Sequence, residues 1–216
     1  MQNFEDVIKD DCYYVDKTPF IEDIEEANKY FFYIRPRRFG KTLTLSMLEN
    51  YYDVNKKDAF EDIFGKLYIG QNPTPERNQY LVLHLNFAQI VGGLDDYQQG
   101  MDNYCSIRFN LFVDLYSHLL PEGTKEGLNQ QKDAVSQLSY LDGQCQKTNQ
   151  KIYLFIDEYD HFTNQILANQ AHEGNYRQQT HGEGYLRKFF DTIKGASVTS
   201  LGRIFVTGVS PVTMDD

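Results

Sequence analysis

One stretch of the chain constrains its fold more than any other, because an apolar run, a basic loop and a helical pattern follow one another directly. Tyr30–Ile34 is aromatic and β-branched, which predicts a strand buried on both faces. The loop is Arg35-Pro-Arg-Arg-Phe-Gly-Lys-Thr42. The helical pattern after it consists of Leu43, Met47, Leu48, Tyr51 and Tyr52. Strand, loop and helix in this order are the context that a phosphate-binding loop requires.

The loop residues suit a triphosphate, which needs inward-pointing N–H groups and the positive end of a helix dipole. Gly40 lets the backbone approach the phosphates, Lys41 can span the β and γ phosphates, and the Thr42 hydroxyl can bind Mg²⁺. The predicted nucleotide-binding segment is completed by Pro36, Arg37, Arg38, Phe39 and Leu43. The alternative is a turn that caps a helix, with Arg37 and Arg38 as solvated cations or as contacts to another subunit.

The loop departs from the general pattern G-x-x-x-x-G-K-[ST] at its first position. Arg35 stands where the first glycine is expected, and Pro36 follows it. Because proline fixes one backbone dihedral angle, the entry to this loop is stiffer than in the general pattern.

A second motif lies more than a hundred residues later, where the apolar strand Ile152–Ile156 ends in two carboxylates. Ligands collect at the carboxyl ends of strands in open α/β sheets. We expect Asp157 to hold Mg²⁺ and Glu158 to orient or deprotonate the attacking water as the catalytic residue, together with Lys41. The alternative is an acidic turn that opens the next helix, and for Asp160 helix capping is the favoured role.

A third segment follows the last predicted strand, Arg203–Val206. The hydroxyl of Thr207 or of Ser210 can sense the γ-phosphate or position the water. A simple turn leaving the strand explains the same residues equally well.

The remaining pattern alternates strands with helices and predicts an α/β fold with three layers, in which helices flank a mainly parallel central sheet. A helix is expected from the cap Thr18-Pro19 to about Asn28, and a strand over Tyr80–Phe87, ended by a Gly92-Gly93 turn. Further helices are expected at Val135–Leu141 and Leu186–Ile193. A long helix stopped by Pro121 is expected from the apolar stripe Ile107, Leu111, Leu115 and Leu119, which Tyr104, Phe112 and Tyr116 widen. Loops are expected at Asn72–Asn78 and Asn169–Gly184.

Composition narrows the class of protein. The net charge of the 216 residues is −10, and between Glu5 and Lys29 nine acidic residues face three lysines. Such a surface repels a polyanion, so we expect no direct nucleic-acid binding by this segment. No apolar run is long enough to span a membrane, and three scattered cysteines indicate a reducing compartment, so a cytoplasmic protein is expected.

The motifs Tyr14-Val-Asp-Lys-Thr18, Arg35–Leu43, Ile156–Asp160 and Phe205–Pro211 resemble, in this order, those of the bacterial AAA-ATPase-like family. The Arg-Pro loop entry is the usual form there. The resemblance implies a P-loop NTPase core with Walker A and Walker B motifs over residues 1–216. Members of that family usually continue into a helical lid and often a restriction-endonuclease-like domain, so the resemblance implies a core that stops before these parts, and whether the native protein continues past Asp216 stays open.

The predicted function is therefore an ATP-binding, Mg²⁺-dependent NTPase module, that is, an ATPase whose turnover as an isolated chain stays open. The alternatives are a nucleotide-switched interaction module with little turnover and a P-loop phosphotransferase. No guanine-reading motif is found, so ATP is preferred. Tyr13, Tyr14 and Phe20 are candidates for stacking on the base, although a core position is the commoner role for each. A homo-oligomer or a nuclease-like domain in trans stays open as a partner.

Overall fold

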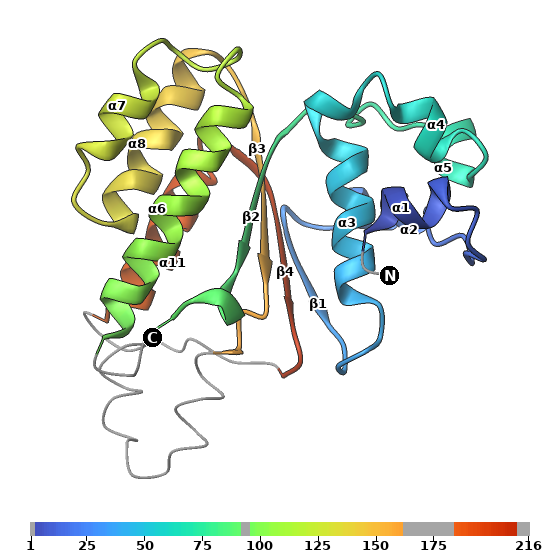
Figure 1. Cartoon of the computed structure of the whole chain (residues 1–216), viewed down its shortest axis with the longest axis horizontal. Coiled ribbons are helices and arrows are strands. Elements are labelled where there is room, and N and C mark those ends of the chain that lie inside the picture. Colours follow the sequence, from blue (N-terminus) through green and yellow to red (C-terminus); the bar gives the residue numbers. More distant parts are fainter. Residues whose placement is uncertain (1–2, 92–95, 162–183, 211–216) are drawn as a thin grey trace.

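The computed structural model describes residues 3–91, 96–161 and 184–210 (Figure 1). Its centre is a sheet of four parallel strands in the order β1-β4-β3-β2. The strands are β1 (Tyr30–Ile34), β2 (Leu81–Asn86), β3 (Ile152–Asp157) and β4 (Leu201–Gly208). All four carboxyl ends therefore lie along one edge of the sheet. The predicted parallel sheet is confirmed.

Helices cover both faces of this sheet, which gives the three predicted layers (Figure 1). One face carries α1 (Phe4–Lys9), α2 (Phe20–Glu26), α3 (Lys41–Tyr52), α4 (Phe60–Phe64), α5 (Tyr68–Gln71) and the 3-10 turn η1 (Val54–Lys56). The other face carries α6 (Tyr97–Leu115), α7 (Thr124–Asn129), α8 (Ala134–Lys147) and α11 (Tyr185–Ala196), with the 3-10 turn η2 (Phe87–Gln89) after β2. Among the described residues, no helix has the length and apolarity that a membrane span needs.

The two faces have cores of different chemistry. On the α1–α5 face the buried cluster is rich in aromatic rings, for example Tyr52 and Tyr153, whose centroids lie 4.8 Å apart. On the α6–α11 face the cluster combines the aliphatic side chains of the strands with residues of α6, α8 and α11. Because side chains alternate along each strand, β3 contributes to both clusters and is buried at every position.

The prediction that Tyr30–Ile34 is buried on both faces is wrong. β1 is an edge strand that pairs only with β4 among the described strands, and Phe32 is 57% exposed. Phe31 and Tyr33 pack against Phe205, at 5.3 Å and 5.8 Å between ring centroids, and Ile34 packs on the core of the opposite face. A run of aromatic residues indicates that a segment forms a strand. The position of that strand in the sheet depends on partner strands that are far away in the sequence.

The stripe predicted for the long helix is right in part. Phe112 and Tyr116 are 3% and 0% exposed, and Tyr104 packs on the core. The row of four aliphatic residues is not the buried one: Ile107, Leu111 and Leu115 are 63%, 53% and 53% exposed, and only Leu119, beyond the helix, packs on the core. The buried face of α6 is a parallel row: Tyr97, Met101, Cys105, Phe109, Phe112 and Val113. Both rows have four-residue spacing, so periodicity alone does not choose between them. The helix also begins earlier than predicted and ends six residues before Pro121.

The predicted Thr18 cap takes a different form. Pro19 occupies the N-cap position of α2, and no side chain caps this helix. The buried Thr18 hydroxyl instead donates to Asp16 at 2.7 Å and accepts from the N–H of Ile69 at 3.2 Å. Thr18 therefore connects the segment before α2 to α5.

The other predicted elements are confirmed: α3, α8, α11, β2, β3 and β4, with ends shifted by a few residues. The predicted turn at Gly92-Gly93 and nearly all of the predicted loop at Asn169–Gly184 lie outside the described residues. The short helices α1, α4, α5 and α7 were not expected from the sequence.

Candidate functional site

Each strand of the sheet delivers a polar group to the same edge. In strand order these are the loop after β1, Thr207 near the end of β4, Asp157 at the end of β3, and Asn86 at the end of β2. The sequence-predicted loop and acidic motif are therefore brought together across β4. The sheet topology places both on one side of the molecule.

The loop, residues 35–40, is exposed at every position and leads into α3. Gly40 is the N-cap of α3, with φ of +76°, and its carbonyl accepts from the N–H of Thr44 at 2.9 Å. A Cβ at this position would meet no atom within 4 Å. The requirement for glycine is therefore one of backbone conformation, since other residues adopt positive φ only with strain.

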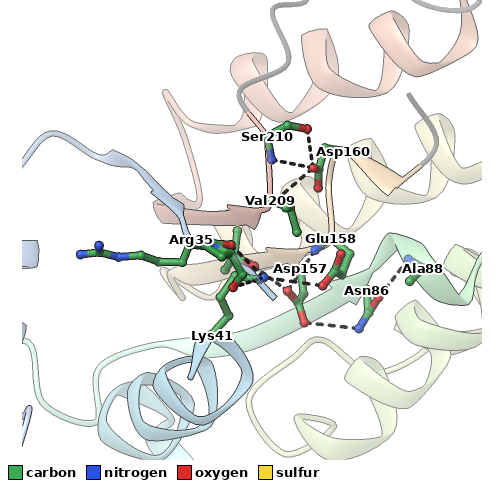
Figure 2. Close-up of polar contacts among 11 residues, drawn as sticks. Arg35, Lys41, Asn86, Ala88, Asp157, Glu158, Asp160, Val209 and Ser210 are labelled. Atoms are coloured by element: carbon green, nitrogen blue, oxygen red, sulfur yellow. Dashed lines mark hydrogen bonds and ion pairs between the residues drawn. The ribbon is translucent and has the colours of Figure 1, made fainter. Parts of the chain in front are cut away.

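Lys41 joins the loop to the acidic motif. Its side chain is 6% exposed, and its Nζ donates to the carbonyl oxygens of Arg35 at 3.1 Å and Pro36 at 3.4 Å. The same nitrogen lies 4.0 Å from Oε1 of Glu158 (Figure 2). At this separation the attraction is about 4 kcal/mol before desolvation is subtracted, for an effective dielectric constant near 20. A buried ammonium group requires such partners.

Asp157 is buried, with 4% of its surface exposed, and its carboxylate is held on both sides. Oδ1 accepts from the Thr207 hydroxyl at 2.5 Å and from the N–H of Glu158 at 3.0 Å. From the described part of the chain, Oδ2 accepts a single long hydrogen bond, 3.4 Å, from the amide of Asn86 (Figure 2). The second oxygen therefore keeps most of its capacity to accept.

Asn86 was missed by the sequence analysis. Its register partner in β3 is Asp157, and its Oδ1 accepts from the N–H of Ala88 at 2.9 Å, which turns the amide nitrogen toward the carboxylate. The sequence marks Asn86 by position alone: it lies near the end of the predicted strand Tyr80–Phe87, where ligands collect, and no short motif singles it out.

Asp160 ties the acidic motif to the turn after β4. Its Oδ2 accepts from the N–H groups of Val209 and Ser210, at 3.0 Å and 2.8 Å, and from the Ser210 hydroxyl at 2.8 Å (Figure 2). Burial acts to raise the pKa of Asp160, but the hydrogen bonds from Ser210 and Val209 outweigh it and lower the pKa. The helix that Asp160 was predicted to cap lies, beyond His161, outside the described residues.

Gly208 makes this connection sterically possible. A Cβ at Gly208 would lie 2.5 Å from the Tyr159 ring and 2.7 Å from Oδ1 of Asp160. The N–H of Tyr159 also donates to the carbonyl of Thr207 at 3.0 Å. The end of β4 and the segment after β3 therefore form one packed unit.

Two residues near Lys41 have unusual backbone conformations. Five described residues other than glycine have positive φ, and three of them are Asn or Asp, which tolerate it best. The other two are Arg38, at +68°, and Glu158, at +52°. Strain of this kind, on the order of 1–3 kcal/mol for each residue, concentrates at functional sites. Both strained residues belong to the two predicted motifs.

The remaining predicted residues surround this centre. Thr42 is exposed in the first turn of α3, and Leu43 packs on the aromatic core. Phe39 is 66% exposed, and Arg37 and Arg38 form no ion pair with any described residue. The Arg35 side chain extends away from Asp157 and Glu158, with its guanidinium 5.4 Å from the centroid of the Tyr33 ring (Figure 2).

A comparison of the sequence with known proteins identifies the family of the chain. A sequence profile described as "Predicted AAA-ATPase" matches residues 1–216. An uncharacterized protein in the vnfD 5′ region of Azotobacter chroococcum mcd 1 is 47% identical over 47 residues, which are 22% of this chain and 9% of that protein. The chain thus matches less than a tenth of that relative's length. No solved structure matches.

Proposed function

Since the chain belongs to the AAA-ATPase-like family of predicted ATPases, we propose that it binds ATP with Mg²⁺ and hydrolyses it at the edge where β1 and β3 end. The observation that carries the proposal is the position of Lys41, whose Nζ lies between the loop carbonyls and Glu158. One cation thereby links the loop that would hold the phosphates to the carboxylate that would act on water.

The residues of the loop supply the phosphate contacts in this proposal. The N–H groups around Gly40 and the start of α3 face the anion, and Lys41 leaves the loop carbonyls to contact the β and γ phosphates. Arg37 and Arg38 add positive charge at the exposed rim. Pro36 fixes one backbone dihedral angle at the entry to the loop, and Phe39 presents an exposed side chain there.

The donors fit a magnesium ion. Mg²⁺ is usually bound by one or two protein oxygens together with phosphate oxygens and water, rather than by a dedicated cage of carboxylates. Within the described residues no group of three or more His, Cys, Asp and Glu side chains could hold a metal. Oδ2 of Asp157 and the exposed hydroxyl of Thr42 are oxygen donors of the required kind. Bound there with phosphate, the ion would neutralise charge on the leaving group.

Glu158 is the proposed catalytic residue. Its carboxylate is partly exposed, with 27% of the side-chain surface accessible, so water reaches it, while Asp157 is enclosed by its partners. Glu158 would accept a proton from the attacking water or orient it. Thr207 and Ser210 both donate their hydroxyls to carboxylates, of Asp157 and Asp160. To sense the γ-phosphate, these hydroxyls would have to act indirectly, through the carboxylates that they contact, or rotate away from them.

The test is phosphate release from ATP, with and without Mg²⁺, by the wild-type chain and the Glu158→Gln variant. We expect Mg²⁺-dependent release that falls by a factor of roughly 10² to 10⁴ in the variant, with the affinity for Mg·ATP retained. Glu61→Gln, at an exposed position of α4, is the matched control and should release phosphate at the wild-type rate.

Three results would change the proposal. Equal rates in Glu158→Gln and the wild type would remove Glu158 from the catalytic role. Tight binding with no release by the wild type would favour a nucleotide-switched interaction module. Transfer of phosphate to an added acceptor in place of water would favour a phosphotransferase.

A further inference from the structure

A groove of about 770 Å³ adjoins the phosphate loop on the side of β1 and α2. Its wall includes Tyr14, Phe20, Tyr33, Phe39, Gly40 and Leu43. Asn86, Asp157, Glu158 and Thr207 are not among the residues that line it. The groove is therefore continuous with the loop but separate from the acidic end of the site. Its volume lies within the range of about 300–1,000 Å³ that is common for small-ligand pockets.

The direction of a bound nucleotide follows from this arrangement. Its terminal phosphate must lie at the Glu158 end if that carboxylate acts on water. The rest of the molecule then leaves the loop on the other side of Gly40, which is the side of the groove. Arg35 lines the groove and extends away from Asp157 and Glu158 (Figure 2). Its positive charge would therefore lie near the part of the ligand that is closest to the loop.

The chemistry of the wall suits a flat heterocycle. Phe20 and Phe39 are 56% and 66% exposed, which is unusual for phenylalanine. Aromatic rings can stack on any nucleobase because every base has a π-face. Lys17 and Asp23 also line the groove and offer a donor and an acceptor to the polar edge of a base.

We propose that this groove holds the purine nucleoside of the nucleotide whose phosphates lie on the loop, with Phe20 as a stacking residue. The proposal rests on the function proposed above and adds the location of the base. The open edge of β1 forms part of this wall, since Phe31, Phe32, Tyr33 and Ile34 all line the groove. The exposure of this aromatic edge strand is thereby explained.

The test separates the base from the phosphates. Calorimetry measures the affinities of the whole chain for Mg·ATP and for Mg·tripolyphosphate, which lacks the nucleoside. Phe20→Ala should weaken Mg·ATP binding roughly tenfold and leave tripolyphosphate binding unchanged. Because the Phe20 side chain is more than half exposed, the variant should keep the thermal stability of the wild type. Tyr13→Ala is the matched control: Tyr13 is 95% exposed, lies outside the groove, and should affect neither affinity.

The outcomes distinguish this inference from the proposed function. If Lys41→Ala abolishes Mg·ATP binding while Phe20→Ala binds as the wild type does, the loop holds phosphate and the groove assignment is wrong. Equal losses of ATP and tripolyphosphate in Phe20→Ala would assign the ring to loop shape and overturn the stacking role. No binding of either ligand to the wild type would reject both proposals. CTP should bind more weakly than ATP to the wild type, since a pyrimidine offers less stacking area, and equal affinities would contradict a purine site.

Discussion

The two motifs that meet at Lys41 differ sharply in how they are held. The phosphate loop, residues 35–40, is exposed throughout, and its arginines form no ion pair with described residues. Asp157 and Thr207 are 4% and 0% exposed and are bonded to each other. The acidic end of the site, defined here as Asp157, Glu158 and Thr207, is thus held by contacts within the protein, whereas the arginine side chains of the loop are exposed to solvent. Changes in the loop should affect ligand binding, and changes at the acidic end should affect stability as well.

The largest effect is expected for Lys41→Ala. Removal of the ammonium group should lower the affinity for Mg·ATP by on the order of a hundredfold or more, since a charged hydrogen-bond partner contributes about 1.5–3 kcal/mol and Lys41 would contact two phosphates. Calorimetry measures this loss. Lys57→Ala, at an exposed position after η1, should bind as the wild type does. An unchanged affinity in Lys41→Ala would rule out the loop as the phosphate site.

The next prediction compares the same substitution, threonine to valine, at the acidic end of the site and at the end of the loop. Thr207→Val removes a buried donor to Asp157 and should lower the free energy of unfolding by about 1–3 kcal/mol. Thr42→Val, at an exposed position, should alter it by less than about 0.5 kcal/mol but weaken the dependence of ATP affinity on Mg²⁺. Urea unfolding and calorimetry at two Mg²⁺ concentrations measure the two effects. Equal loss of stability in both variants would contradict the contrast between exposed loop and buried acidic end.

The smallest effect concerns pH. Hydrogen bonds hold the pKa of Asp160 below its value of 3.8 in the unfolded chain, against the opposing influence of burial. The folded state therefore binds fewer protons, so the stabilisation by this group is complete well above pH 3.8 and is lost as the pH falls through the folded pKa. Asp160→Asn should lose this acid-dependent part of the stability.

The measurement is urea unfolding between pH 7 and pH 3. Asp58→Asn, at an exposed position, should keep the wild-type pH profile. A profile of Asp160→Asn that matched the wild type throughout this range would show that Asp160 carries no differential charge on folding.

The sequence predicted the local elements of the site well, because each is written in consecutive residues. The glycine before Lys41 and the apolar strand before Asp157 have the structures expected of them, and the run before Arg35 forms the expected strand, although at the edge of the sheet and not buried on both faces. Asn86 was not found, because its relation to Asp157 arises from the register of β2 against β3 and not from any short motif. The bond between Asp160 and Ser210 likewise joins residues fifty positions apart.

The sequence by itself determined the parallel α/β class, the two motifs and their order, since these follow from side-chain period, turn residues and charge within short windows. Only the tertiary structure decided that β1 lies at the edge, that α6 buries one of its two apolar rows and not the other, and that an aromatic groove opens beside the loop. The physical reason is that the burial of a residue depends on two packed elements. The sequence of one element determines which apolar side chains it carries, and the element that packs against it determines which of these side chains are removed from water.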